Sequence, residues 1–182
     1  MSLNGDIMIK YTTETLENAQ IDCLGIVNSC YGKEAIEYLE KTKLVSNERY
    51  SGYLSNALYR FKDKLNSLKG KEKISLLNTN YVSYYTYFPT IYFMIIYPYE
   101  DSLIRYNSLK GNLFQIKKEA KHSVIGFPYN LGLSKNLEWD EIHKVLVEVF
   151  DDKDIIVFDA PEAIIKKYSK QSLWSKIKRL FS

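Results

Sequence analysis

The chain has 182 residues, of which 46% are hydrophobic and 26% are charged, and its formal net charge is +3. This length suits one globular domain with a full core, and the small net charge gives no support for a nucleic-acid partner. The sequence contains no run of about 20 apolar residues, the length needed to cross a membrane. The N-terminus also lacks the basic region and apolar core of a secretory signal, so we expect a cytoplasmic protein.

Cysteine and histidine are scarce, with two of each in the sequence. A structural zinc site needs about four such ligands at recognisable spacings, and the sequence offers no such pattern. We therefore expect no metal site and no cofactor.

The first half begins with two predicted strands and continues with two predicted helices. The strands are Ile7–Tyr11 and Cys23–Val27, the second of which ends at Asn28 and Ser29. Lys33–Lys43 has one apolar face, and Asn47–Leu68 carries an apolar stripe along a highly charged stretch, so both are expected to be helices.

The second half alternates between strands and helices. We expect strands at Ile74–Leu77 and Ile91–Tyr97, with Tyr81–Thr86 as a hairpin strand beside them, and then a helix within Leu103–Ala120. A buried strand, a loop, a helix and a last strand follow, at Ser123–Phe127, Pro128–Gly132, Trp139–Phe150 and Asp154–Phe158. This order predicts an α/β fold with a mostly parallel sheet, in which ligands bind at the carboxyl ends of the strands.

Two stretches carry a family pattern: "IGFPYNLGLSKNLEWDEIHKVLVEVF" and, more loosely, "IKYTTETLENAQIDCLGIVNSCYGKEAI". Together with the order of the elements, they resemble the macro domain, a three-layer α/β/α fold that binds ADP-ribose. It covers residues 7–159 and is nearest to the small phage, bacterial and terminal-ADP-ribose-hydrolase-like branch. It implies a mixed, mostly parallel central sheet and an ADP-ribose or related NAD-derived nucleotide as the ligand.

The resemblance also implies positions for ligand contacts near the start of the chain. Glu14 stands where the family has an aspartate that accepts a hydrogen bond from adenine, and Asp22 is expected near the same base. Asn28, followed by Ser29, stands near the asparagine that faces the distal ribose. In the first phosphate loop Gly32 remains, but Glu34 replaces a glycine and about two residues are missing, so this loop departs from the family pattern.

The second loop keeps more of the pattern. The resemblance places the diphosphate over Gly132 and the distal ribose near Tyr129, and the remaining contacts would come from Asn130, Leu131, Leu133 and Ser134. Hydrolases of this branch use a lysine and an aspartate. Here the lysine position falls at Tyr97–Tyr99 without a lysine, and Ser134 takes the place of the aspartate. Serine cannot replace a carboxylate in proton transfer near neutral pH, so we expect no hydrolysis.

A basic amphipathic tail is predicted for residues 160–182. From Ser172 onward its apolar residues share one helical face, and lysine and arginine occupy the rest. This face could dock on the domain, lie on a membrane surface or contact a protein partner, and the sequence leaves these alternatives open. The expected contact residues are Leu173, Trp174, Ile177, Lys178, Leu180 and Phe181.

Three functions therefore compete. The first is a binding module for ADP-ribose without hydrolysis, or pseudoenzyme, and the second is a scaffold of the same fold that has lost its ligand. The tyrosine-rich run Tyr81–Tyr99 favours the second as a contact surface, such as that of a homodimer, because tyrosine is enriched at interfaces. The third is a phosphatase acting on ADP-ribose phosphate or a de-ADP-ribosylating hydrolase.

Overall fold

The computed structural model describes residues 9–16, 18, 20–29, 34–41, 51–79, 82–85, 89–97, 105–121, 123–133 and 137–169. Within them a six-stranded sheet has the order β1-β6-β5-β2-β4-β3. Only the pairing of β3 with β4 is antiparallel, so the predicted mixed and mostly parallel sheet is confirmed. The strands are β1 (Ile9–Tyr11), β2 (Cys23–Ser29), β3 (Val82–Tyr85), β4 (Thr90–Tyr97), β5 (Ile125–Pro128) and β6 (Ile155–Phe158).

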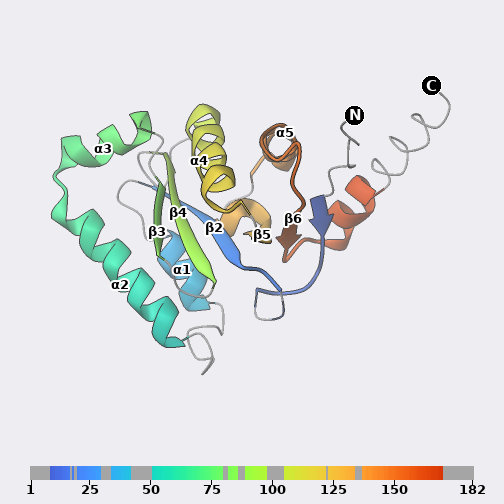
Figure 1. The fold of residues 1–182 in the computed structure, drawn as a ribbon, viewed down its shortest axis with the longest axis horizontal. Helices are drawn as coiled ribbons and strands as arrows, with labels where there is room; N and C mark the ends of the chain where they lie inside the picture. The colour runs from blue at the N-terminus through green and yellow to red at the C-terminus, as the bar shows by residue number, and fades with distance from the viewer. Residues whose placement is uncertain are drawn as a thin grey trace.

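Two layers of helices enclose this sheet, each with its own apolar cluster. The helices are α1 (Glu34–Lys41), α2 (Ser51–Ser67), α3 (Gly70–Asn78), α4 (Tyr106–Glu119) and α5 (Trp139–Val149). Residues of α4 and α5 share one core cluster, while residues of α1, α2 and α3 share the other. In Figure 1, α2 and α3 lie beside β3, and a helical segment of residues 162–169 lies near β1 at the opposite side. No helix in the described ranges is long and apolar enough to cross a membrane.

The predicted strand Ile74–Leu77 is wrong, because these residues belong to α3. Four apolar or small residues are too short a run to separate a strand from a helix by periodicity. The start of α3 is marked instead by Glu72, whose carboxylate accepts a hydrogen bond of 2.7 Å from the backbone N–H of Lys69. A glutamate three residues after the N-cap is the reciprocal half of a capping box. The predicted hairpin strand is confirmed by β3, which pairs with β4.

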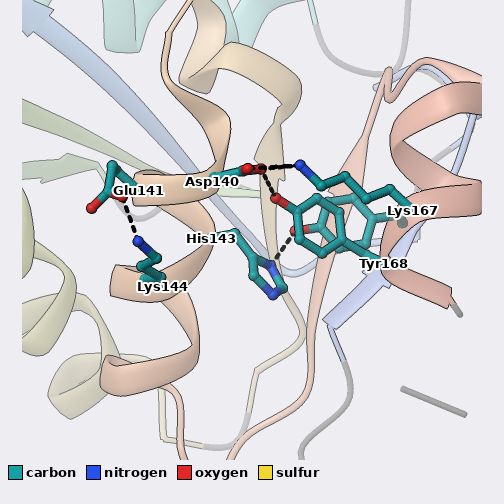
Figure 2. Close-up of polar contacts among 7 residues, drawn as sticks. Asp140, Glu141, His143, Lys144, Lys167 and Tyr168 are labelled. Carbon is teal, nitrogen blue, oxygen red and sulfur yellow. Dashed lines mark hydrogen bonds and ion pairs between the residues drawn. The ribbon is translucent and has the colours of Figure 1, made fainter. Parts of the chain in front are cut away.

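The edge strand β1 is tied to α5 through His143. Its Nδ1 atom lies 2.6 Å from the Tyr11 hydroxyl, in hydrogen-bond contact, and its ring lies 3.9 Å from that of Tyr168 between centroids. Figure 2 shows His143 between the labelled side chains of α5 and segment 162–169. Burial lowers the pKa of His143 to about 4, an effect that the Asp140 carboxylate opposes and Lys167 reinforces.

We expect His143 to make the fold less stable as the pH falls from about 6.5 to about 4. The unfolded chain takes up a proton at the usual histidine pKa of about 6.5, whereas the folded chain resists protonation until about pH 4. Because the ring is only partly buried, solvent screening reduces the loss to about 1–2 kcal/mol. Urea unfolding at pH 7 and pH 4.5 measures it, with His143→Gln as the control. Equal pH dependence of the two proteins would contradict the assignment.

Candidate functional site: the carboxyl edge of the sheet

The candidate site is built on the turn η2 (Tyr129–Gly132), which leaves the carboxyl end of β5. Three consecutive residues have left-handed backbone conformations, with φ of 57° at Asn130, 54° at Leu131 and 83° at Gly132. The backbone N–H of Leu133 then donates a 2.9 Å hydrogen bond to the carbonyl of Asn130, which closes the turn. A left-handed conformation costs an ordinary residue such as leucine roughly 1–2 kcal/mol. Strain of this kind persists only where the surroundings enforce it, and it is concentrated at functional sites.

Gly132 is required by space as well as by conformation. A Cβ atom built on it would lie 3.0 Å from Ile26 Cγ2 and 3.3 Å from Tyr38 Cγ. Strand β2 and helix α1 therefore both press on this position. The side chains of Leu131 and Leu133 are buried beside it, with exposures of 0% and 6%. The turn is thus held in place by β2, by α1 and by its own two buried leucines.

Asn130 brings an unusual polar atom to the turn. Its side-chain Oδ1 is buried and makes no hydrogen bond with any of the described residues. Leaving a buried acceptor unsatisfied costs about 1–3 kcal/mol, so native structures rarely keep one without a reason. This oxygen is suited to accept a hydrogen bond from a donor that the described part of the chain does not supply.

A second part of the site lies where β1 and β6 end. The backbone N–H of Asp159 donates to the carbonyl of Glu14 at 2.9 Å, and the N–H of Glu14 donates to the Thr12 hydroxyl at 3.1 Å. Asp159 itself has a left-handed φ of 56°. These bonds hold two exposed carboxylates, Glu14 and Asp159, at the same edge of the sheet as η2.

Tyr38 of α1 joins the two parts. Its ring lies against Gly132, and its hydroxyl donates a 3.0 Å hydrogen bond to Asp159 Oδ2. Burial, with a further contribution from the Asp159 carboxylate, raises the pKa of Tyr38. Tyr38 therefore keeps its proton near neutral pH and acts as a donor. Neither Tyr38 nor Asp159 was predictable as a site residue from the sequence, since 121 positions separate them along the chain.

The structure brings most of the predicted ligand residues together. Glu14, Tyr129, Asn130, Leu131, Gly132 and Leu133 lie at the carboxyl edge, and so do Asn28 and Ser29, the last two residues of β2. Gly32 and Ser134 lie outside the described residues, as do the predicted tail contacts from Leu173 to Phe181.

Asp22 is not brought to this edge. It precedes β2, and its Oδ2 accepts a 2.7 Å hydrogen bond from the backbone N–H of Val124, just before β5. Seven strand residues at about 3.3 Å each separate it from the far end of β2, a span of roughly 20 Å. The carboxylate of Asp22 therefore joins the amino ends of two strands, and the adenine contact expected for it does not fit its position.

Three hollows lined by described residues lie away from η2. One of about 490 Å³ lies between α3 and α4 and is lined by Leu77, Asn78, Arg105, Tyr106, Asn107 and Ser108. Two others of about 420 and 570 Å³ share Lys121 and Lys153, near the end of α4 and the start of β6. Lysines beside a helix C-terminus are expected from the helix dipole alone.

The described residues contain no group of three or more His, Cys, Asp or Glu side chains that could hold a metal ion.

Comparison with known proteins identifies the fold. No family model matches the sequence, and no curated protein sequence matches it. The solved macrodomain of Thermus aquaticus DarG superposes with a TM-score of 0.56 at 14% identity, covering 85% of this chain and 99% of that one. The macrodomain of Mycobacterium tuberculosis DarG gives 0.55, again at 14% identity, with 85% and 99% coverage. A macrodomain protein from Streptomyces coelicolor gives 0.51 at 11% identity, with 85% and 100% coverage. The macro-domain fold that the sequence resemblance implied is therefore confirmed: the chain has the macrodomain fold.

Proposed function

We propose that this chain is a binding module for ADP-ribose or a closely related nucleotide and that it does not hydrolyse its ligand. The observation that carries the proposal is the strained left-handed turn at Asn130–Gly132, with the unsatisfied Asn130 Oδ1 beside it. Consecutive backbone N–H groups in such a turn can form a concavity that binds an anion. A diphosphate with flanking hydroxyl groups supplies both the charge for the turn and a donor for the oxygen.

The fold supports this ligand class. Ligands of parallel α/β sheets bind at the carboxyl ends of the strands, where η2, Glu14 and the end of β2 meet. In the proposed pose the diphosphate lies over Asn130–Gly132 and the distal ribose lies toward Tyr129 and Asn28. The adenine lies toward Glu14. Asp159, next to Glu14, is a second carboxylate that could accept a hydrogen bond from the adenine amino group.

The absence of hydrolysis is proposed from the residue types. Ser134 stands where the resembling hydrolases have a carboxylate, and their lysine position falls around Tyr97–Tyr99, where this chain has no lysine. Neither serine nor tyrosine can supply the acid–base chemistry near neutral pH. Incubation with a mono-ADP-ribosylated protein should therefore release no ADP-ribose. Release at a rate that depends on the amount of this protein would instead favour the hydrolase alternative.

Titration calorimetry of the full chain with ADP-ribose, and with AMP and ribose 5-phosphate as part-ligands, tests the binding. Asn130→Gly is the sharpest variant, because glycine adopts the left-handed conformation freely and only the side chain is lost. We expect ADP-ribose to bind about 5- to 100-fold more weakly to this variant, as for loss of one buried hydrogen bond. Its unfolding free energy should change by less than about 1 kcal/mol, because the unsatisfied oxygen is removed as well.

A scaffold that has lost its ligand is the second candidate, and Tyr38 is the observation that favours it. Its side chain lies between Gly132 and Asp159, so it fills space between the proposed positions of the diphosphate and the adenine. The same titration separates the two candidates. No heat with millimolar ADP-ribose, for both the wild-type chain and Tyr38→Ala, would rule out the module and leave the scaffold.

A further inference from the structure

After β6 the chain returns along the edge of the molecule as the helical segment 162–169, which packs against β1 and α5. Tyr168 in this segment is only 6% exposed and belongs to the core cluster on the α4 and α5 side of the sheet. Its ring stacks on Tyr11 of β1, with centroids 5.0 Å apart and planes 14° apart. Ile164 packs against the same cluster. The segment is therefore docked on the domain by a buried aromatic side chain.

Polar contacts fix the position of this segment on α5. Lys167 Nζ lies 2.6 and 2.7 Å from the two carboxylate oxygens of Asp140, and the Tyr168 hydroxyl donates to Asp140 Oδ1 at 2.5 Å. Figure 2 shows both side chains reaching the one carboxylate from segment 162–169. Asp140 is the second residue of α5, immediately after Trp139. The three bonds therefore meet at the end of α5 that is nearest in sequence to η2.

A continuous row of aromatic rings connects this docking point to η2, the turn proposed to bind the ligand and called the ligand turn below. Tyr11, stacked on Tyr168, meets the ring of Trp139 edge-on at 6.4 Å. Trp139 in turn contacts Tyr129, with ring centroids 4.7 Å apart. Tyr129 is the first residue of η2, and the left-handed residues follow it directly. Packed side chains of this kind can carry a coupling free energy between two places in a protein.

We propose that Tyr168 is a positioning residue for the ligand turn. The docked segment presses Tyr11 against Trp139 and so fixes the surface on which Tyr129 rests. The left-handed conformation of Leu131 is unfavourable on its own, so it depends on such support from its neighbours. When segment 162–169 is undocked, the turn relaxes and its binding geometry is lost. The effect on ADP-ribose rests on the proposed function, whereas the effect on the turn does not.

Amide hydrogen exchange of the unliganded full chain tests the effect on the turn. In Tyr168→Ala, peptides covering residues 129–133 should exchange about 2- to 30-fold faster than in the wild type, while β4 should be unchanged. Tyr59→Ala is the matched control, because Tyr59 is 70% exposed on α2 and should change neither region. A merely global destabilisation would speed exchange in β4 as well. Unchanged exchange at residues 129–133, or an equal rise in both regions, would overturn the proposal.

Tyr168→Phe keeps the ring stack and removes only the bond to Asp140, so it serves if the alanine variant does not fold. It should also speed exchange at residues 129–133, but by a smaller factor than the alanine variant. If exchange at these residues is unchanged, the proposal is overturned. ADP-ribose should reciprocally slow exchange in residues 162–169, because coupling between two sites acts in both directions. If the wild-type chain gives no heat with ADP-ribose, the proposed function fails, and the unliganded comparison still decides the role of Tyr168.

Discussion

Gly25→Ala should lower the free energy of unfolding by about 2–3 kcal/mol, because its methyl group has no room. A Cβ built on Gly25, in the middle of β2, would lie 2.3 Å from Cε1 and 2.8 Å from Cδ1 of Phe127. The Phe127 side chain is fully buried and touches Phe150, with ring centroids 5.7 Å apart, so it cannot move without displacing the core. Urea unfolding monitored by circular dichroism measures the loss.

The control for this variant is Gly52→Ala. Gly52 is exposed near the start of α2, and its added Cβ would have no atom within 4 Å. Alanine in an exposed helix should stabilise the protein by about 0.5–1 kcal/mol. The two glycine replacements are therefore expected to have opposite signs.

A double-mutant cycle identifies the cause of the loss. Phe127→Leu alone removes buried ring atoms and should cost about 1–2 kcal/mol. In that background the penalty of Gly25→Ala should be less than half of its value in the wild type, since the clashing ring is absent. A penalty of the same size in both backgrounds would show that the contact with Phe127 is not responsible.

The example of Gly25 shows which parts of the fold could be predicted from the sequence. The apolar runs that became β2, β4, β5 and β6, and the amphipathic pattern of α5, are local signals that a single sequence displays. The contact between Gly25 and Phe127 depends on the parallel pairing of β2 with β5, which are about 100 residues apart in sequence. No local pattern reports it. Even the local signal failed at Ile74–Leu77, because a short apolar run fits both a strand and the helix α3.

The candidate site divides in the same way. The turn at Tyr129–Gly132 was predictable because asparagine and glycine favour left-handed backbone and follow a buried strand. The link from Gly132 through Tyr38 to Asp159 was not, because it joins α1 to the end of β6 through tertiary packing. Asp22 is the opposite case, a residue expected at the site that lies elsewhere. Its carboxylate suggested a ligand contact, yet it accepts a hydrogen bond from the backbone N–H of Val124 at the amino ends of the strands.

Gly132→Ala should both destabilise the fold and weaken ligand binding. Alanine at a φ of 83° is strained by about 1–2 kcal/mol, and its Cβ would press on Ile26 and Tyr38 at 3.0 and 3.3 Å. With overpacking added, the free energy of unfolding should fall by about 2–4 kcal/mol. If the turn relaxes to relieve this strain, its N–H groups no longer converge, and ADP-ribose should bind at least about tenfold more weakly.

Weaker binding has to be separated from the loss of stability, and Leu58→Ala is the matched control. Leu58 lies on α2 in the opposite core cluster and is 8% exposed. Its truncation should therefore lower the free energy of unfolding by a similar amount, about 2–3 kcal/mol. Calorimetry at low temperature, where both variants remain folded, should show unchanged affinity for Leu58→Ala and weakened affinity for Gly132→Ala. Equal affinities would mean that the turn at Gly132 is strained only to complete the core. ADP-ribose would then bind somewhere other than over Gly132, and the proposed role of the turn and of the Asn130 oxygen in binding would be wrong.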